Sequence, residues 1–391
     1  MSTFTHIIRA MTFTPGLNGR WGIPMLFESE PGMAKTSILN TLRDDGLAVV
    51  TILGSVRDPS DIGGLPVEVN GVIHRCPDTW VAEVTKAKRA VVFFDELNTS
   101  MPAVMNAMLR VINEGVVGDD TLPPTVRFVA AQNPVEQTAG GYDLAPPMAN
   151  RFCHVAWQAP THADWSSWML GSDDAAFGAD AGNPNADVDG ETAEALEAKV
   201  LKAWPRAWSR ARGTVAAFIG ARPELLHKMP KVDDPNASKA WPSRRTWEMA
   251  ARVLAGADVH KLSEADTNLL VAGCVGVAAS AEFSAWRAAQ DLPDAAAVLD
   301  GEVSFGHDPR RLDRTAAVLN ACAALVADRG CDKREARITM LWTMLGALVD
   351  HAADLTVPAA RVLIKAGLGG NAAARPTLAK LEPLLRAAGI R

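Results

Sequence analysis

The sequence predicts an α/β protein in which a parallel sheet wound with helices is followed by a long helical region. Strand-like and helix-like segments alternate from residue 1 to about residue 157, as expected for such a sheet. A loop typical of phosphate binding follows the first strand-like run. From Glu191 onward the apolar residues recur almost wholly at helical spacing.

The composition suits a protein of more than one domain. At 391 residues the chain is long for a single compact unit, so two or three units that share interfaces are expected. Hydrophobic residues make up 48% of the chain, which is enough for packed cores. The net charge of −6, with no run of Lys or Arg longer than a pair, argues against a dedicated nucleic-acid surface.

Neither a disulfide framework nor a membrane span is expected. The five cysteines lack the C-x-x-C spacing of zinc sites and suit a reducing compartment. The most apolar run, Leu269 to Ala281, is too short and too rich in Ala and Gly to cross a bilayer. Because the N-terminus lacks a charged segment followed by an apolar one, the chain is expected to be soluble and cytoplasmic.

Five apolar runs predict the strands of the sheet. They are Pro24–Glu28, Ala48–Leu53, Ala90–Asp95, Thr125–Ala131 and Cys153–Trp157. One helix is expected to run from Lys35 to near Gly46, because glycine commonly ends a helix. Another is expected after Ser100 as the cap, with Pro102 just inside, and to continue to Glu114.

Two excursions interrupt the sheet pattern. Asn70-Gly71 stands between alternating apolar residues in the stretch from Gly63 to His74, which is the strongest short signal for a β-hairpin. Residues 115–124 are expected to fold back on themselves before the fourth strand. Each excursion is also open to a simpler interpretation as an ordinary surface loop.

The second half of the chain is predicted to be helical after a polar loop. Residues 171–190 are rich in Asp, Ala and Gly without a basic residue, so a solvated loop is expected there. The expected helices are Glu191–Ala203, Trp208–Ile219, Arg245–Ala255, Ser263–Ala281, Pro309–Asp328, Lys333–Ala353, Ala359–Ala366 and Pro376–Ala388. They show no fixed repeat period.

The stretch Ser29 to Thr36, which reads SEPGMAKT, has the spacing of a phosphate-binding loop. The usual pattern is G-x-x-x-x-G-K-S/T, because small residues let consecutive backbone N–H groups turn toward a polyphosphate. Here Ser29 and Ala34 replace the two glycines, whereas Lys35 keeps the charge for the outer phosphates. Thr36 would supply a hydroxyl for Mg²⁺. The residues expected to contact ATP are Glu30, Pro31, Gly32, Met33, Ala34, Lys35, Thr36 and Ser37. Taken alone, the motif is also compatible with an accidental Gly-Lys-Thr turn.

Two carboxylates follow the strand Ala90–Asp95, which is apolar enough to be central in a parallel sheet. Adjacent acids at the end of a buried strand are costly unless they hold a metal or move a proton. Asp95 is therefore expected to bind, through water, the Mg²⁺ that it shares with Thr36, and Glu96 to polarise the attacking water. The simpler alternative is a strand that ends in a solvated acidic turn. Together with the loop at Ser29, the acidic pair predicts an ATPase core.

Five motifs stand in a characteristic order along the chain: EPGMAKT, DPSDIGGLPV (Asp58 to Val67), DELN (Asp95 to Asn98), AAQNP (Ala130 to Pro134) and ANRF (Ala149 to Phe152). With these motifs the chain resembles the MoxR group of AAA+ ATPases, in the helix-2-insert clade, over about residues 7 to 255. In that group alanine commonly replaces the last glycine of the phosphate loop. The resemblance therefore accommodates Ala34.

The resemblance assigns further catalytic roles. Asn133 is expected to sense the γ-phosphate or its attacking water through its neutral amide; the alternative is a turn-forming Asn before Pro134. Arg151 is similar to the arginine finger that one subunit offers to its neighbour's nucleotide, where a planar cation spreads over transition-state charge. The alternative for Arg151 is a helix-terminal arginine paired with a local acid.

A further arginine is implied at the start of a lid helix, reaching back to the γ-phosphate of the nucleotide on its own chain. Arg245 matches that family position best, with Ser243 as the helix cap, and Arg244 is the alternative. The simpler interpretation is a capped helix with a solvated basic first turn.

The resemblance also implies the architecture. It gives a P-loop AAA+ core with a parallel five-stranded sheet in the order 5-1-4-3-2 over residues 1–157, an α-helical lid over 158–285 and a C-terminal helical extension over 286–391. The hairpin at Asn70-Gly71 becomes the helix-2 insert (about 54–88). Residues 115–124 become the pre-sensor-1 hairpin, which precedes the strand that leads to Asn133. In this clade both hairpins project toward a central pore.

The function implied is that of a ring-forming, ATP-driven chaperone, a hexamer that remodels or assembles a client protein together with a von Willebrand A domain partner. A nucleic-acid motor or loader is one alternative, which the acidic balance disfavours. A nucleotide-dependent scaffold with little hydrolysis is another, which the complete set of catalytic residues disfavours. A preference for guanine stays open, because no residue is identified that reads the base.

Overall fold

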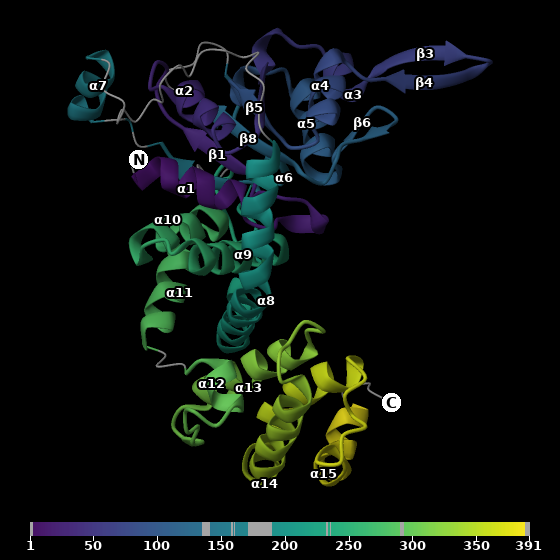
Figure 1. Ribbon diagram of the computed structural model, residues 1–391, viewed down its shortest axis with the longest axis vertical. Helices are drawn as coiled ribbons and strands as arrows, with labels where there is room; N and C mark the ends of the chain where they lie inside the picture. The colour runs from purple at the N-terminus through teal and green to yellow at the C-terminus, as the bar shows by residue number, and fades with distance from the viewer. Residues whose placement is uncertain are drawn as a thin grey trace. The chain divides into compact units, whose positions relative to one another are not determined.

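The computed structural model describes residues 3–134, 141–157, 159, 161–170, 190–231, 234, 236–289 and 293–387. Five parallel strands form one sheet in the order β2-β5-β8-β1-β9. Its three central strands, β5, β8 and β1, are labelled in Figure 1. The five strands are β1 (Met25–Glu28), β2 (Ala48–Leu53), β5 (Ala90–Asp95), β8 (Val126–Gln132) and β9 (Cys153–Ala156). Counted along the chain and read from β9, this is the predicted order 5-1-4-3-2, and the five predicted strands are confirmed.

Helices cover both faces of the sheet, which is why its strands are apolar at successive positions. The helices of this part are α1 (Thr3–Thr12), α2 (Lys35–Asn40), α3 (Pro59–Gly63), α4 (Thr79–Ala87), α5 (Pro102–Glu114), α6 (Pro146–Ala149) and α7 (His162–Met169). Leu26 of β1 packs into a core shared with α4, α5 and α6. Its neighbour Phe27 faces the other side and packs edge-on against Phe4 of α1, with ring centroids 5.7 Å apart.

The helix predicted after Ser100 begins where expected, but its cap was predicted wrongly. Pro102 is the first residue of α5, and Met101 is the N-cap, without a side-chain capping bond. The hydroxyl of Ser100 is buried and makes no hydrogen bond within the part of the chain that the structure describes. The pattern Ser-x-Pro thus marks the helix start but does not decide which residue caps it.

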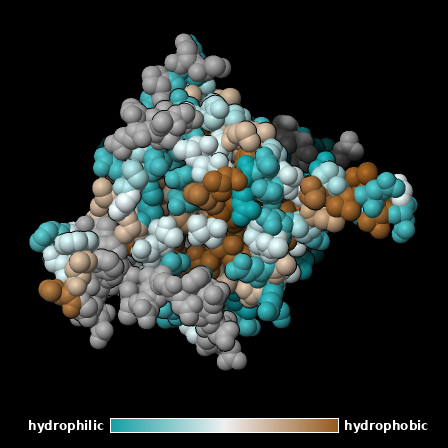
Figure 2. All heavy atoms as spheres, turned by 90° about the horizontal axis from the view of Figure 1, so that it is seen from above, coloured by the Kyte–Doolittle hydropathy of each residue, from teal (hydrophilic) through white to brown (hydrophobic). Residues whose placement is uncertain are grey.

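The hairpin predicted at Asn70-Gly71 is confirmed. Strand β3 (Leu65–Val69) pairs antiparallel with β4 (Val72–Cys76). Asn70 and Gly71 form the turn with φ of 53° and 77°, the left-handed backbone that a two-residue type I′ turn requires. Every residue of both strands is exposed, and Figure 2 shows apolar surface along this projection.

The excursion before the fourth core strand is also a hairpin. It pairs β6 (Val116–Val117) with β7 (Asp120–Thr121). In its turn, Asp119 Oδ2 accepts from the backbone N–H of Arg75 in β4 at 3.1 Å. In return, the carbonyl oxygen of Arg75 accepts from the backbone N–H of Asp119 at 3.2 Å. The two hairpins are therefore hydrogen-bonded to each other.

Two of the helix boundaries predicted in the second half are wrong. The helices predicted as Glu191–Ala203 and Trp208–Ile219 form one helix, α8 (Gly190–Ala221), which continues through Pro205. The single helix predicted as Ser263–Ala281 is instead two, α10 (Glu264–Val275) and α11 (Val277–Ala289). Gly276 separates them with φ of +83°, and a Cβ there would lie 2.7 Å from the carbonyl oxygen of Ala240. The predicted loop at 171–190 lies outside the described residues except for its last residue, Gly190, which begins α8.

The C-terminal helices pack around their own core. They are α12 (Ala295–Leu299), α13 (Leu312–Ala327), α14 (Arg334–Lys365) and α15 (Ala374–Ala387). The helix α14 is interrupted at Ala352, whose φ of −152° and ψ of 54° are not helical, next to the end at Ala353 that was predicted for the first of two helices in this stretch. Arg337 of α14 is almost buried and donates to both carboxylate oxygens of Asp300, at 2.8 and 2.7 Å.

The chain divides into two compact units. The first comprises Met1–Val200 and Lys228–Val277, and the second comprises Leu201–His227 and Ala278–Arg391. Besides the sheet, the first unit contains α9 (Arg244–His260) and α10. The predicted division at residues 157 and 285 stays a prediction. Within the described residues, no helix is long and apolar enough to cross a membrane.

Candidate functional site

Several predicted site residues gather at one edge of the sheet, because the carboxyl ends of parallel strands lie along the same edge. Lys35 opens α2 after β1, Asp95 ends β5, and Asn133 follows β8. The Nζ of Lys35 donates to Oδ1 of Asn133 at 3.0 Å. Loops that are about 100 residues apart in the sequence are thus joined by a direct hydrogen bond.

The loop before α2 has a closed conformation. Lys35 Nζ donates to the carbonyl oxygens of Ser29 and Glu30 at 3.2 and 3.4 Å, so the chain curls around its ammonium group. Gly32 and Ala34 both have positive φ, +79° and +57°. A left-handed conformation costs an L-residue about 1–2 kcal/mol, so the alanine that replaces glycine adopts a strained backbone.

The charges at this edge are partly shielded from water. Lys35 is only 8% exposed, and its burial lowers its pKa, although the carboxylates of Asp95 and Glu96 favour its charged form. Burial also raises the pKa of Asp95, although the backbone N–H of Glu96 and the charge of Lys35 oppose this rise. Because Lys35 and Asp95 lose hydration in this way, their charged forms favour a ligand whose atoms replace the lost contacts with water.

Thr36 and Asp95 are suited to hold Mg²⁺. Thr36 is exposed in the first turn of α2, which follows β1, and Asp95 ends β5, which β8 separates from β1 in the sheet. The backbone N–H of Glu96 donates to Asp95 Oδ1 at 2.9 Å, which orients the carboxylate. A hydroxyl with one carboxylate fits Mg²⁺, because this ion keeps several waters and binds phosphate oxygens beside one or two carboxylates.

Glu96 is fixed from both ends. Its backbone is left-handed, with φ of 53°, and its carboxylate Oε2 accepts from the hydroxyl of Ser55 at 2.8 Å. Ser55 lies in the turn that follows β2. Sequence reasoning missed Ser55, because nothing in its local sequence points to a residue 41 positions away.

Asn98 is a second residue whose role the sequence did not reveal, although the residue belongs to the DELN motif. Its side chain is 1% exposed. Its amide nitrogen donates to the carbonyl oxygen of Asn133 at 2.7 Å, and its amide oxygen accepts from the Asn133 backbone N–H at 3.3 Å. Asn98 therefore fixes the backbone of Asn133 and aims the side chain that contacts Lys35.

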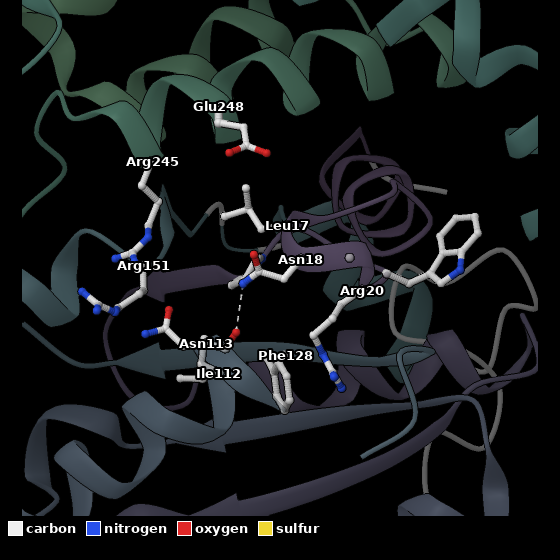
Figure 3. A pocket seen from close by; sticks show the side chains of 12 residues that line it. Leu17, Asn18, Arg20, Ile112, Asn113, Phe128, Arg151, Arg245 and Glu248 are labelled. Atoms are coloured by element: carbon white, nitrogen blue, oxygen red, sulfur yellow. Dashed lines mark hydrogen bonds between the residues drawn. The ribbon is translucent and has the colours of Figure 1, made fainter. Parts of the chain in front are cut away.

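Arg151 and Arg245 lie at the opposite edge of the sheet. Arg151 directly precedes Phe152 and β9, and Arg245 projects from the first turn of α9 into the same pocket (Figure 3). Phe128 also lines this pocket. It lies five residues before Asn133 along the same strand, which corresponds to about 16 Å. The structure thus brings the two arginines together but does not bring Arg245 to Lys35.

Arg151 is held by its neighbours in the pocket. Its Nη1 donates to the carbonyl oxygen of Pro147. When the Asn113 amide is turned with its oxygen toward the guanidinium, Oδ1 accepts from Nε and Nη2 at 3.0 and 3.1 Å. Burial, together with the charge of Arg245, lowers the pKa of Arg151 to about 10. Two nearby cations in a half-buried pocket favour an anion.

Arg151 and Arg245 lie close together because Asn150 and Ser243, which are near them in the sequence, are hydrogen-bonded to each other. The hydroxyl of Ser243 donates to Asn150 Oδ1 at 2.8 Å, and Asn150 directly precedes Arg151. Ser243 is the N-cap of α9, as predicted, and also accepts from the N–H of Thr246 at 3.2 Å. Of the two arginines that follow the cap, Arg245 lines the pocket whereas Arg244 is exposed.

Comparison with known proteins identifies the domain that carries these features. Residues 24–154 match the model of the ATPase family associated with various cellular activities (AAA). A solved structure of a candidate ATPase from Cytophaga hutchinsonii is 18% identical, with 69% of this chain and 78% of that chain covered and a TM-score of 0.43. No curated protein matches the chain. The matched residues span the phosphate loop, the acidic pair, four strands of the sheet and the first two residues of β9. Residues 24–154 therefore match an ATPase domain of the AAA family.

Proposed function

We propose that this protein is a MoxR-like, Mg²⁺-dependent ATPase that assembles into a ring, a hexamer, and uses ATP hydrolysis to remodel or assemble a client protein. The observation that carries the proposal is the position of Arg151 and Arg245. They form a cationic pocket on the sheet edge opposite to Lys35, Asp95 and Glu96. Cations placed there suit a nucleotide bound to another copy of the chain.

The hydrolytic part of the site is assigned to the edge with the phosphate loop. Lys35 binds the outer phosphates, and Mg²⁺ held by Thr36 and Asp95 would neutralise their charge. Glu96 accepts a proton from the attacking water, and Ser55 orients its carboxylate. Asn133 orients the same water or the γ-phosphate through its amide. Before nucleotide binds, the contact of Asn133 with Lys35 keeps both groups in place.

The arginines are assigned to the neighbouring subunit's nucleotide. The sequence suggested this role for Arg151, whereas Arg245 was expected to reach the nucleotide of its own chain. Because Arg245 shares the pocket of Arg151, we now infer that both cations act on the same neighbouring phosphate. Hydrolysis would then remove the anion that joins two subunits and loosen that interface.

The exposed hairpins are assigned to the client. The strands β3 and β4 carry apolar side chains that are largely open to solvent, such as Leu65, Val72 and Ile73 at 58%, 57% and 64% exposure. An isolated two-stranded hairpin with so little cover is marginally stable in water, which favours a protein partner for its surface. A partner with a von Willebrand A domain is proposed on the MoxR resemblance alone, and a cytoplasmic location on the five scattered cysteines, which suit a reducing compartment.

Phosphate release and mass measurement test this proposal together. With Mg²⁺ and ATP the wild-type chain should hydrolyse ATP and assemble into a hexamer in light scattering. Glu96→Gln should keep nucleotide binding and assembly but lower turnover by about 10²- to 10⁴-fold, the usual scale for a catalytic base. Near-wild-type hydrolysis in that variant would remove Glu96 from its role. A chain that stays monomeric with a non-hydrolysable analogue would contradict the ring.

A nucleic-acid motor is the remaining alternative. It predicts ATP turnover stimulated by DNA or RNA, and binding that weakens steeply as salt rises. The net charge of −6 disfavours it. Turnover that is unchanged by added single- and double-stranded DNA and RNA at low salt would exclude it.

A further inference from the structure

The indole N–H of Trp157 donates a hydrogen bond to the carbonyl oxygen of Met33 at 2.8 Å. Met33 lies within the phosphate loop, and Trp157 directly follows β9, the edge strand beside β1. The two residues are 124 positions apart. A residue outside every predicted motif thus contacts the backbone of the loop.

Trp157 is a rigid donor. It is 8% exposed, and its own backbone N–H donates to the carbonyl oxygen of Glu28 at 3.0 Å. Its ring packs edge-on against Phe4 and Phe27, with centroids 4.8 and 5.1 Å away. Because both its backbone and its ring are fixed, the direction of the indole N–H is set by the fold rather than by the loop.

This hydrogen bond fixes one peptide plane of the loop. In a trans peptide the C=O and the N–H point in opposite directions. Holding the Met33 carbonyl toward Trp157 therefore turns the N–H of Ala34 away from Trp157. Ala34 is also the residue with φ of 57° and ψ of 25°, a conformation that glycine adopts readily and alanine does not.

We propose that Trp157 is a positioning residue for the nucleotide, which holds the Met33–Ala34 peptide so that the Ala34 N–H faces the bound phosphates. The tether lets alanine stand where a phosphate loop usually has glycine. This inference rests on the proposed function, because it requires that the loop from Ser29 to Thr36 binds a nucleoside polyphosphate.

Calorimetric titration with Mg-ADP tests the inference on the full-length protein. Trp157→Phe deletes the N–H but keeps an aromatic ring, and it should weaken ADP affinity about fivefold, as expected for the loss of one hydrogen bond. In the Ala34→Gly background the same substitution should weaken affinity about twofold or less, because glycine takes the loop conformation without the tether. Phe4→Leu is the matched control. It disturbs the packing of the ring but keeps the N–H, so it should lower Tm and change ADP affinity by less than about twofold.

The outcomes separate this inference from the proposed function. If the wild-type chain does not bind Mg-ADP, the proposed function itself falls. If it binds and Trp157→Phe binds equally well, only the role of Trp157 is overturned. Equal losses in Trp157→Phe and Phe4→Leu would mean that the ring acts through packing alone. If Trp157→Phe weakens ADP affinity equally with Ala34 and with Gly at position 34, the hydrogen bond does not act by supporting the strained alanine.

Discussion

The side chain of Asn98 holds the backbone of Asn133 through two hydrogen bonds, one to its carbonyl oxygen and one from its N–H. Asn133 in turn accepts from the ammonium group of Lys35. The end of β8, the turn after β5 and the phosphate loop are therefore connected by three hydrogen bonds. A change at Asn98 is expected to reach Lys35 through this chain of contacts.

Asn98→Ala should lower kcat about tenfold, because it leaves two partly buried backbone groups of Asn133 without their partner and releases the Asn133 side chain. Asn98→Asp keeps the acceptor but loses the donor, so its loss should be intermediate. Steady-state hydrolysis and Tm are measured on both variants. If Asn98→Ala lowers Tm while the folded fraction keeps its full kcat, the residue is structural only.

Arg151→Ala and Lys35→Ala should each abolish most hydrolysis, yet a mixture of the two should regain part of it. In a mixed ring, an intact Arg151 can face an intact Lys35 at some interfaces. The measurement is phosphate release as a function of mixing ratio. The absence of rescue at every ratio would count against action in trans.

Arg245→Ala should behave like Arg151→Ala in the same mixing experiment, because the two arginines share one pocket. The control is Arg244→Ala, which changes the exposed neighbour and should keep most of the activity. Rescue of Arg151→Ala without rescue of Arg245→Ala would return Arg245 to the nucleotide of its own chain.

Asp95→Asn should raise Tm at pH 7 while it abolishes Mg²⁺-dependent turnover. Burial raises the pKa of Asp95, so the folded state disfavours its ionised form. A raised pKa contributes stability at low pH that is lost as pH rises through the folded value. The Tm advantage of the neutral variant should therefore shrink as the medium is acidified. A lower Tm than wild type at pH 7 would show that the attraction of Lys35 outweighs burial.

Asp300→Asn should destabilise the C-terminal helices by about 2 kcal/mol at pH 7, the scale of a hydrogen bond between charged groups. The hydrogen bonds from Arg337, aided by Lys333, lower the pKa of Asp300 from 3.8 to about 2. This stability is present above the ordinary pKa and is lost as pH falls through the folded value. Scanning calorimetry should show that the difference in Tm between the wild type and Asp300→Asn disappears between pH 4 and pH 2.

The control is Lys333→Ala, which removes an exposed partner of Asp300 and should change Tm little. A difference between the wild type and Asp300→Asn that persists at pH 2 would contradict the ion pair as its cause.

Local chemistry explains which parts of the fold could be predicted. The run from Ala90 to Phe94 is apolar at every position because both faces of its strand are covered, and Asn70-Gly71 is one of the few dipeptides that readily form a type I′ turn. The break between α10 and α11 at Gly276 could not be predicted in this way. The neighbours of Gly276 favour a helix, and only the close approach of the Ala240 carbonyl makes a break at this glycine necessary.

By itself, the sequence determined the strands, their order through the family resemblance, and the residues at the phosphate-loop edge. It could do so because Lys35, Asp95 and Asn133 each stand directly beside a strand end that the apolar pattern marks. Tertiary structure alone decided that Arg245 joins Arg151, that Asn98 holds Asn133, and that Trp157 holds Met33. The reason is physical: these contacts join residues that are 35 or more positions apart, so they arise from how the strands and helices pack, and no local pattern encodes that packing.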